Sequence, residues 1–284
     1  MSELIHPATR IGAVHLVTAG LEQQIDFYRT TLGLKLLRQN DPAASLGAAD
    51  RPLIVLTEVP GAKRARRTTG LYHLAIRLPS RLELARTLAH LAETDAAFEG
   101  VANHGVSESL YLHDLDNNGI EIYCDRSMDS WPRGTQGQLK MDTLPLDLDN
   151  LMDELAANDR PWDGLHPQTD IGHVHLHVGQ LNAAQQFYQQ VLGLTLTQHM
   201  ASGAAFLAAG NYHHHVGINT WLGVGTPPPP PNAIGLRWFE LRLPNETERG
   251  KVVERVQAAG LSWEEVEGGM LVRDPSRNGV LLTC

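Results

Sequence analysis

The residues best suited to chemistry in this 284-residue chain are histidines together with one glutamate on an apolar strand. His73 and His173 each lie seven positions before the turn that starts a predicted helix, so they occupy equivalent places in the sequence. Glu121 stands between two isoleucines on a predicted buried strand. A buried carboxylate is costly unless it is paired or binds a cation. Two neutral imidazoles and one carboxylate form a typical ligand set for a divalent metal and leave coordination positions open.

Strand alternation turns these histidines toward a shared interior. Successive side chains of a strand point to opposite faces, so Leu74 and Ile76 are expected to pack on a helix while His73 faces away from it. The same alternation turns three histidines of a later strand inward: His173, His175 and His177. One inward histidine is more typical of a core residue whose hydrogen bonds are satisfied. Two histidines at equivalent positions favour a ligand pair.

The elements that position these residues recur along the chain. Residues 11–36 align without a gap to residues 171–196, and GLYHLAIRLP from Gly70 aligns to GLRWFELRLP from Gly235. Each unit begins with a period-two strand pattern, continues at helical spacing and finishes with short strands. The repeat therefore predicts an α+β protein of four tandem βαβββ modules.

The repeat also divides the chain into two halves. Modules one and two are expected in residues 8–126 and modules three and four in residues 169–284, joined by residues 127–168. The spacing of four leucines in the joining segment predicts an ordered linker packed on the surface. These leucines are Leu144, Leu146, Leu148 and Leu151.

Composition disfavours several classes of function. The formal net charge of -9 argues against nucleic acid as a partner, and the basic run at residues 63–67 is expected to be a solvated loop. The longest apolar runs are far too short to span a membrane. Residues 1–6 lack the segments of a secretory signal, so we expect a cytoplasmic protein. The chain's two cysteines cannot build a disulfide framework or a thiolate zinc site.

Four such modules in tandem resemble the vicinal oxygen chelate superfamily, which contains glyoxalases, bleomycin resistance proteins and extradiol dioxygenases. Within it, the chain looks like the bacterial two-domain catechol-2,3-dioxygenase-like proteins. Two stretches carry that likeness, HHHVGINTW at residues 213–221 and NGIEIY at residues 118–123. The resemblance implies that paired modules curl into two cupped barrel-like domains around a metal.

The resemblance also implies where the metal ligands lie. A histidine is expected on the first strand of a module and a glutamate or histidine on its last strand, which assigns His73, His173 and Glu121. The equivalent positions of modules one and four cannot bind a metal, since they hold Ala13, Trp238 and Leu281. One site per chain is therefore expected, and its ligands require module two to pair with module three and module one with module four.

An alternative arrangement keeps each half of the chain together. Modules one and two then form one barrel, and His15 replaces His173 beside His73 and Glu121. His15 lies two residues out of register but still faces inward. The two arrangements differ in which strands share a sheet.

Further residues take roles from the extradiol-dioxygenase signature, which residues 104–121 resemble with departures at residues 102, 115 and 117. By this resemblance Tyr111 hydrogen-bonds the substrate or the oxygen at the metal, and His104 orients a substrate hydroxyl. His215, with His213 on the same face, matches the acid–base histidine, a role that suits the imidazole pKa. The alternatives are a strand aromatic for Tyr111, a loop histidine for His104 and a surface run for residues 213–215.

The function implied by the resemblance is that of an Fe(II)-dependent extradiol ring-cleaving dioxygenase acting on a catechol-type substrate with O2. A small aromatic diol and O2 are thus the expected partners. The same cysteine-free ligands also fit Mn, Zn or Ni. The pattern leaves the formation of a homo-oligomer open.

Two other functions compete with this one. A glyoxalase-like isomerase or lyase of the same superfamily usually needs a fourth protein ligand, whereas this chain offers further histidines and no additional glutamate. A metal-free small-molecule binding protein would leave Glu121 and the two matched histidines without a role.

Overall fold

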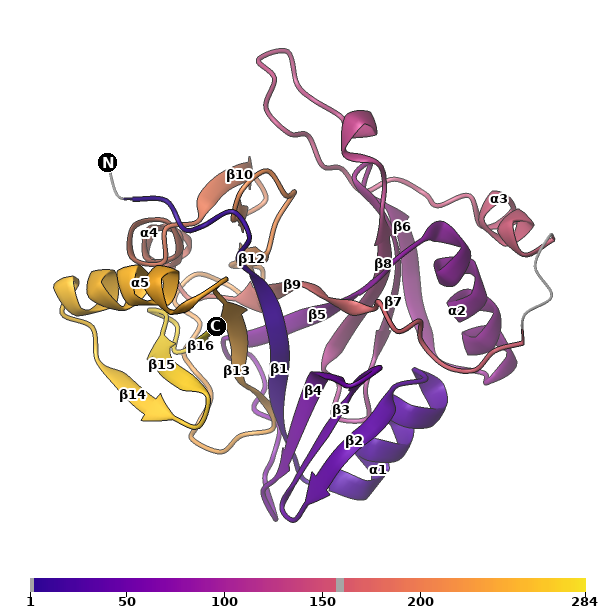
Figure 1. The fold of residues 1–284 in the computed structure, drawn as a ribbon, viewed down its shortest axis with the longest axis horizontal. Coiled ribbons are helices and arrows are strands. Elements are labelled where there is room, and N and C mark those ends of the chain that lie inside the picture. Colours follow the sequence, from indigo (N-terminus) through magenta and orange to yellow (C-terminus); the bar gives the residue numbers. More distant parts are fainter. Residues whose placement is uncertain (1–2, 157–160) are drawn as a thin grey trace.

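Four βαβββ repeats build the structure, a computed structural model that describes residues 3–156 and 161–284 (Figure 1). The strands of modules one and two are β1 (Arg10–Thr18), β2 (Lys35–Asn40), β3 (Ala43–Ala48), β4 (Arg51–Glu58), β5 (Gly70–Leu78), β6 (Phe98–Asn103), β7 (Ser107–His113) and β8 (Gly119–Asp125). Those of modules three and four are β9 (Asp170–His177), β10 (Thr195–Met200), β11 (Ala204–Ala208), β12 (Val216–Asn219), β13 (Gly235–Arg242), β14 (Trp263–Val266), β15 (Gly269–Arg273) and β16 (Gly279–Thr283).

One helical segment follows the first strand of every module. These segments are α1 (Leu21–Asp26) with its π-helical continuation η1 (Phe27–Thr31), α2 (Arg81–Glu93), α4 (Leu181–Gln186) with η4 (Phe187–Val191), and α5 (Glu246–Ala258). The helical spacing expected for module one is confirmed, because its apolar residues are all buried. They are Leu21, Ile25, Tyr28 and Leu32. Gly33 follows in the left-handed region at φ 75°, which glycine adopts without steric cost, and the helix ends there.

Side-chain caps set where two of these helices begin. The Ser80 hydroxyl accepts a hydrogen bond from the backbone N–H of Glu83 at the start of α2, and the Asn245 side chain accepts one from Glu248 at the start of α5. Such caps satisfy a backbone donor that the helix itself cannot. The number of residues between first strand and helix is nearly the same in all four modules, including modules one and three, whose helices have no side-chain cap. This is why counting back from the helix found equivalent strand positions.

The strands of the described residues form two eight-stranded mixed sheets. Modules one and four build the outer-module sheet, in the order β14-β15-β16-β13-β1-β4-β3-β2. Modules two and three build the inner-module sheet, in the order β10-β11-β12-β9-β5-β8-β7-β6. In each module the first strand runs parallel to the last, and the two first strands of a sheet pair antiparallel at its centre. The α+β class, the four modules and the pairing of two with three are confirmed.

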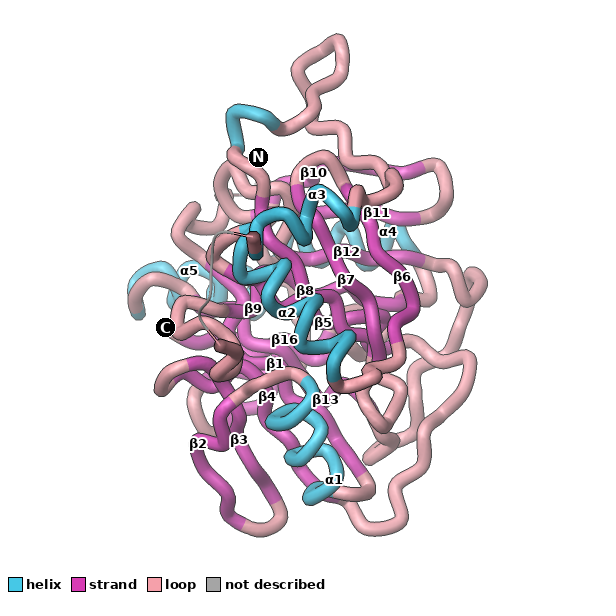
Figure 2. The backbone as a smooth tube through the Cα atoms, turned by 90° about the vertical axis from the view of Figure 1, so that its right-hand side faces the viewer, coloured by secondary structure: helices cyan, strands magenta, loops and turns pink. Residues whose placement is uncertain are grey.

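The helices cover the outer faces of the two sheets (Figure 2). The α2 helix contacts β5 and β8, and α4 contacts β11 and β12. Leu74, Ile76 and Leu78 of β5 are buried in the apolar core, as alternation predicts. The opposite face of β5 is therefore free to point polar side chains into the inner-module sheet's concave side.

The segment between the halves contains short helices. They are η2 (Met128–Ser130), α3 (Leu148–Met152) and η3 (Asp153–Leu155), and α3 and η3 pack against α2. Of the leucines expected to anchor this linker, Leu146 and Leu151 are buried, whereas Leu144 and Leu148 are exposed. Part of the linker predicted over residues 127–168, namely 157–160, lies outside the described residues.

The helices of the described residues include none that is long and apolar enough to cross a membrane.

Two buried hydrogen bonds tie the modules of each half together across the two sheets. The Tyr28 hydroxyl donates to Asp114 at 3.0 Å, and the Tyr188 hydroxyl donates to Asp274 at 3.2 Å. Both tyrosines sit in the π-helical turns η1 and η4, at equivalent places in the repeat. Burial raises the pKa of Asp274 to about 6, although hydrogen bonds from Asn278, Ser276 and Tyr188 act to lower it. The Asp274 carboxylate is therefore charged at pH 8, where these hydrogen-bond donors stabilise its charge.

We predict that Tyr188→Phe destabilises the fold more at pH 8 than at pH 5. Removing the hydroxyl raises the folded-state pKa of Asp274 further. A carboxyl whose pKa is higher in the folded state than in the unfolded state lowers the stability of the fold as the pH rises through the folded-state pKa. A hydrogen bond to a charged group contributes about 1.5–3 kcal/mol, against about 1 kcal/mol for a neutral pair. Urea unfolding at both pH values measures the difference. Val252→Ala removes only buried apolar contacts and should lower the free energy of unfolding equally at pH 5 and pH 8. An equal loss at the two pH values for Tyr188→Phe would contradict the prediction.

Candidate metal centre

The centre of the inner-module sheet brings His73, Glu121 and His173 together. In the register of β5 with its neighbours, Ala75 lies opposite Glu121 of β8 on one side and opposite His173 of β9 on the other. His73 is two residues before Ala75 on the same face of β5. The methyl group of fully buried Ala75 leaves room between the two flanking side chains. Three adjacent strands therefore supply one side chain each to a single point.

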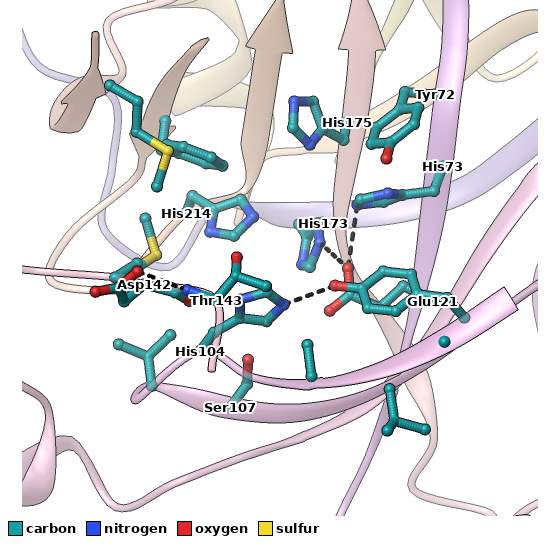
Figure 3. Close-up of a pocket in the computed structure, with 18 of the residues that line it drawn as sticks. Tyr72, His73, His104, Ser107, Glu121, Asp142, Thr143, His173, His175 and His214 are labelled. Atoms are coloured by element: carbon teal, nitrogen blue, oxygen red, sulfur yellow. Dashed lines mark hydrogen bonds and ion pairs between the residues drawn. The ribbon is translucent and has the colours of Figure 1, made fainter. Parts of the chain in front are cut away.

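The three side chains converge on one carboxylate oxygen (Figure 3). His73 Nε2 and His173 Nε2 each lie 3.1 Å from Glu121 Oε2. All three residues are buried, with relative exposures of 7%, 2% and 2%. Among the described residues they are the group of three whose donor atoms all lie within 4.8 Å of one another.

The donor geometry fits a shared cation. Donors about 2.0–2.2 Å from one ion lie near 3 Å from each other when they occupy adjacent coordination positions, which is close to the 3.1 Å found here. His73 Nε2 is fully buried and makes no aligned hydrogen bond, despite its closeness to Glu121. A buried polar atom without a partner is costly. A metal ion between these atoms would satisfy it.

Burial keeps the surrounding imidazoles neutral. It lowers the pKa of His173 to about 4, outweighing the opposite effect of Glu121, and it lowers the pKa of His175 and His214 well below the usual value. Neutral imidazole nitrogen carries the lone pair that a metal needs. Asn219 Nδ2 donates to His175 Nε2 at 3.0 Å, so the proton of the His175 ring lies on Nδ1.

A serine orients the carboxylate from behind. Ser109 Oγ donates to Glu121 Oε1 at 2.7 Å, and Ser109 is fully buried on β7. The bond engages one carboxylate oxygen and leaves Oε2 for the two histidines. Outer partners of this kind hold metal ligands in place and tune their basicity. The sequence analysis missed Ser109, although it lies two residues before Tyr111 and shares its face of the strand.

A cavity of about 490 Å³ opens beside the three residues. Tyr111 and His104, both assigned from the signature, line it. His104 Nδ1 lies 2.8 Å from the backbone oxygen of Asp142, which can only accept, so Nδ1 carries the proton. His104 Nε2 then accepts from the Tyr111 hydroxyl at 2.7 Å. Burial and the charge of Glu121 raise the pKa of Tyr111 well above its usual value, so the phenol keeps its proton.

The three consecutive histidines at residues 213–215 lie in different surroundings. His214 lines the cavity, and its ring lies 4.1 Å from that of His173, centroid to centroid. His213 and His215 do not line it: His213 contacts Asp125, and His215 Nδ1 accepts the backbone N–H of Ala209. The segment lies just before β12 and lacks strand alternation. The structure therefore brings His214 to the cavity instead of the expected pair.

A chain of hydrogen bonds sets the ring protons of this histidine run. His213 Nε2 lies 2.9 Å from Asp125 Oδ1, so this nitrogen carries the proton, and His213 Nδ1 then accepts from His214 Nδ1 at 2.8 Å. The lone pair of His214 is consequently on Nε2. Tyr212 also donates to Asp125 at 3.0 Å. Asp125 was not predicted as a site residue, because nothing in its sequence context shows that it meets residues 212 and 213.

The outer-module sheet lacks a comparable site. Its equivalent positions hold Ala13, Trp238 and Leu281, all in the expected strands. His15 lies opposite Trp238 in this sheet, bonds Thr57 Oγ1 at 2.7 Å and is 8% exposed. The structure thus places His15 in a different sheet from His73 and Glu121, and the alternative arrangement of modules is not the one observed.

The fold and the site define a protein of paired βαβββ modules with a buried His-His-Glu group that is open to a cavity. The chain belongs to the Glyoxalase/Bleomycin resistance protein/Dioxygenase superfamily, whose family model matches residues 10–122 and 170–280.

Among curated proteins, the chain is a homologue of catechol-2,3-dioxygenase of Bacillus subtilis (strain 168), with 43% identity over 275 residues and 95% of each chain covered. Solved structures share the fold at low identity. A Bacillus subtilis protein matches with a TM-score of 0.65 at 12% identity, covering 99% of this chain and 86% of that one. Glyoxalase I from Zea mays matches with a TM-score of 0.61 at 16% identity, covering 97% and 92%.

We predict that Ser109→Ala weakens metal binding by about 10- to 100-fold, the range typical for loss of a partner behind a ligand. The carboxylate would lose the hydrogen bond that holds Oε1 and could turn away from the histidines. Titration of the metal-free protein with Fe(II) without oxygen measures the affinity. Ser107→Ala, on the same strand and lining the cavity, is the matched control and should bind Fe(II) as the wild type does. Equal affinity in both variants would remove Ser109 from the site.

We also predict that His173→Ala abolishes Fe(II) binding, whereas His15→Ala retains it. His173 contacts Glu121 in the inner-module sheet, while His15 belongs to the other sheet. Metal content after reconstitution and desalting distinguishes the two variants, and circular dichroism checks that both are folded. Retained metal in His173→Ala together with loss in His15→Ala would refute the assignment.

Proposed function

We propose that this protein is an Fe(II)-dependent extradiol ring-cleaving dioxygenase that acts on a catechol-type substrate with O2. The observation that carries the proposal is the buried group of His73, Glu121 and His173 at the edge of a cavity. Homology over 95% of the chain to a catechol-2,3-dioxygenase supports the same activity.

His73, His173 and Glu121 would hold the metal. Three protein ligands on one side leave positions open for a chelating substrate and O2, as in other non-haem Fe(II) oxygenases. When bound, Fe(II) supplies a template for the two reactants and a path for electrons between them. Mn, Zn and Ni accept the same donors, and homology to a dioxygenase favours iron.

Tyr111 and His104 bind and orient the substrate in this proposal. Both line the cavity, and the Tyr111 hydroxyl is held at 2.7 Å by His104 Nε2. The backbone oxygen of Asp142 fixes the His104 ring from the other side. Because the one phenol proton is donated to His104, the Tyr111 oxygen can accept a hydrogen bond from a hydroxyl of the bound diol. The pair thus positions the diol against the three candidate ligands.

The acid–base role expected of His215 falls in our proposal to His214, which lines the cavity. The hydrogen-bond chain from Asp125 through His213 leaves the lone pair of His214 on Nε2. That nitrogen can accept a proton from the diol and return it later. His213 serves as a positioning residue, while His215 bonds the backbone at Ala209 and makes no contact with the cavity.

A glyoxalase-like reaction is less well supported. The candidate metal group contains three residues in the part of the chain that the structure describes, and no fourth His, Cys, Asp or Glu joins it. Such isomerases usually use a fourth protein ligand. The neutral His214 ring beside the cavity offers a proton acceptor for a diol instead.

We predict that protein loaded anaerobically with Fe(II) converts catechol in air to a yellow ring-opened semialdehyde while consuming equimolar O2. Absorbance and an oxygen electrode follow the two quantities. His73→Ala, which lacks one candidate ligand, should show neither signal at the same protein concentration. Iron binding without oxygen uptake by the unmodified protein would overturn the proposed function, and isomerisation of a hemithioacetal by the Zn or Ni form would favour the glyoxalase-like alternative.

A further inference from the structure

The charged side chains that line the candidate cavity are predominantly acidic. Its described lining residues include no lysine or arginine, whereas two acidic side chains besides Glu121 line it, Glu99 and Asp142. We propose that the cavity selects its substrate by charge: it accepts a catechol whose side chain carries an ammonium group and rejects one whose side chain carries a carboxylate. This inference rests on the proposed function and names the substrate class of the same site.

Sheet register places Glu99 away from the metal end of the cavity. Gly100 of β6 lies opposite Tyr111 of β7, which lies opposite Glu121 of β8. Neighbouring strands are about 4.8 Å apart, so the backbone beside Glu99 is roughly 10 Å from that of Glu121. A diol bound at the three candidate ligands would direct a short side chain across this span toward Glu99.

Among the described residues, the basic side chain paired with these two acidic groups is an imidazole, at Glu99. Glu99 contacts the His113 ring, and Asp142 Oδ1 accepts the backbone N–H of Thr143 at 2.9 Å. Within the described residues, no lysine or arginine forms an ion pair with either carboxylate. Negative charge along a cavity with apolar walls attracts a cation and repels an anion.

Aromatic side chains at the same cavity add a second feature that suits an ammonium group. The rings of Tyr72 and Trp221 lie 5.3 Å apart, centroid to centroid, in an edge-to-face arrangement, and both line the cavity. Ring faces attract cations when the charge lies within about 6 Å.

The cavity has room for a substituted ring. Its volume of about 490 Å³ is within the range of sites that hold ligands of drug size. Val101, Met200 and Phe206 line it and would contact the aliphatic part of a side chain. Apolar, acidic and aromatic side chains thus line the same cavity as the three candidate ligands.

The test uses three catechols whose side chains have similar size and different charge: aminoethyl, propyl and carboxymethyl. For the Fe(II)-loaded protein at pH 8, kcat/KM should decrease from aminoethyl to propyl to carboxymethyl, by about tenfold or more between the charged pair. Calorimetric affinities measured without oxygen should follow the same order. The binding measurement tests the inference even if no ring is cleaved.

The double variant Glu99→Gln/Asp142→Asn tests the cause of this order. The ratio of aminoethyl to carboxymethyl values should fall toward one in both kcat/KM and affinity, with the propyl compound as the internal reference. Glu264→Gln, an exposed acidic residue on β14 outside the cavity, is the matched control and should keep the wild-type ratio.

The outcomes separate this inference from the proposed function. Cleavage of none of the three catechols would overturn the function, while an affinity ranking by charge would still support the cavity's selectivity. Equal or reversed ranking in both measurements would overturn the inference and leave the dioxygenase proposal standing. A ranking that the double variant does not reduce would likewise overturn it, because the selection would then come from other residues.

Discussion

The antiparallel pairing of β5 with β9 is the constraint on which the candidate site depends. It joins strands from different halves of the chain, so residues about a hundred positions apart meet across one pair of strands. Small Ala75 lies opposite both Glu121 and His173 in this register. A shift of one residue in β9 would turn His173 to the other face of the sheet. The burial of Val174 and Leu176 in the core opposes that shift.

Several histidines buried around this pairing have a hydrogen-bond partner for a ring nitrogen, whereas His173 Nδ1 and His73 Nε2 have none. Asn219 donates to His175 and accepts from His177 Nδ1 at 2.8 Å, and Asp125 fixes His213. Satisfied networks of this kind give each ring one tautomer, whereas an unsatisfied nitrogen would cost free energy. The unpartnered Nε2 of His73 is therefore informative, since it faces the carboxylate where a cation fits.

Much of this arrangement could be predicted from the sequence because it depends on local rules. The first strand of each module lies at a nearly constant distance along the chain from the helix, and alternation then assigns each strand residue to a face. This was enough to find His73, His173 and the pairing of modules two and three. It failed for His214, because residues 213–215 precede β12 and follow no strand period. It also could not foresee that Asp142, in the linker, closes over the cavity beside His104.

The outer-module sheet has the same strand register but lacks the three candidate metal ligands, so other contacts occupy the equivalent positions. His15 contacts Trp238 edge to face at 4.7 Å between ring centroids, as His175 contacts His73 at 5.1 Å in the inner-module sheet. Where His173 would stand, the backbone N–H of Ala13 donates to Glu240. Replacing buried polar groups with packed side chains is often neutral or stabilising. The inner-module sheet keeps the costlier set of buried polar side chains, and the proposed binding of metal and substrate would account for that cost.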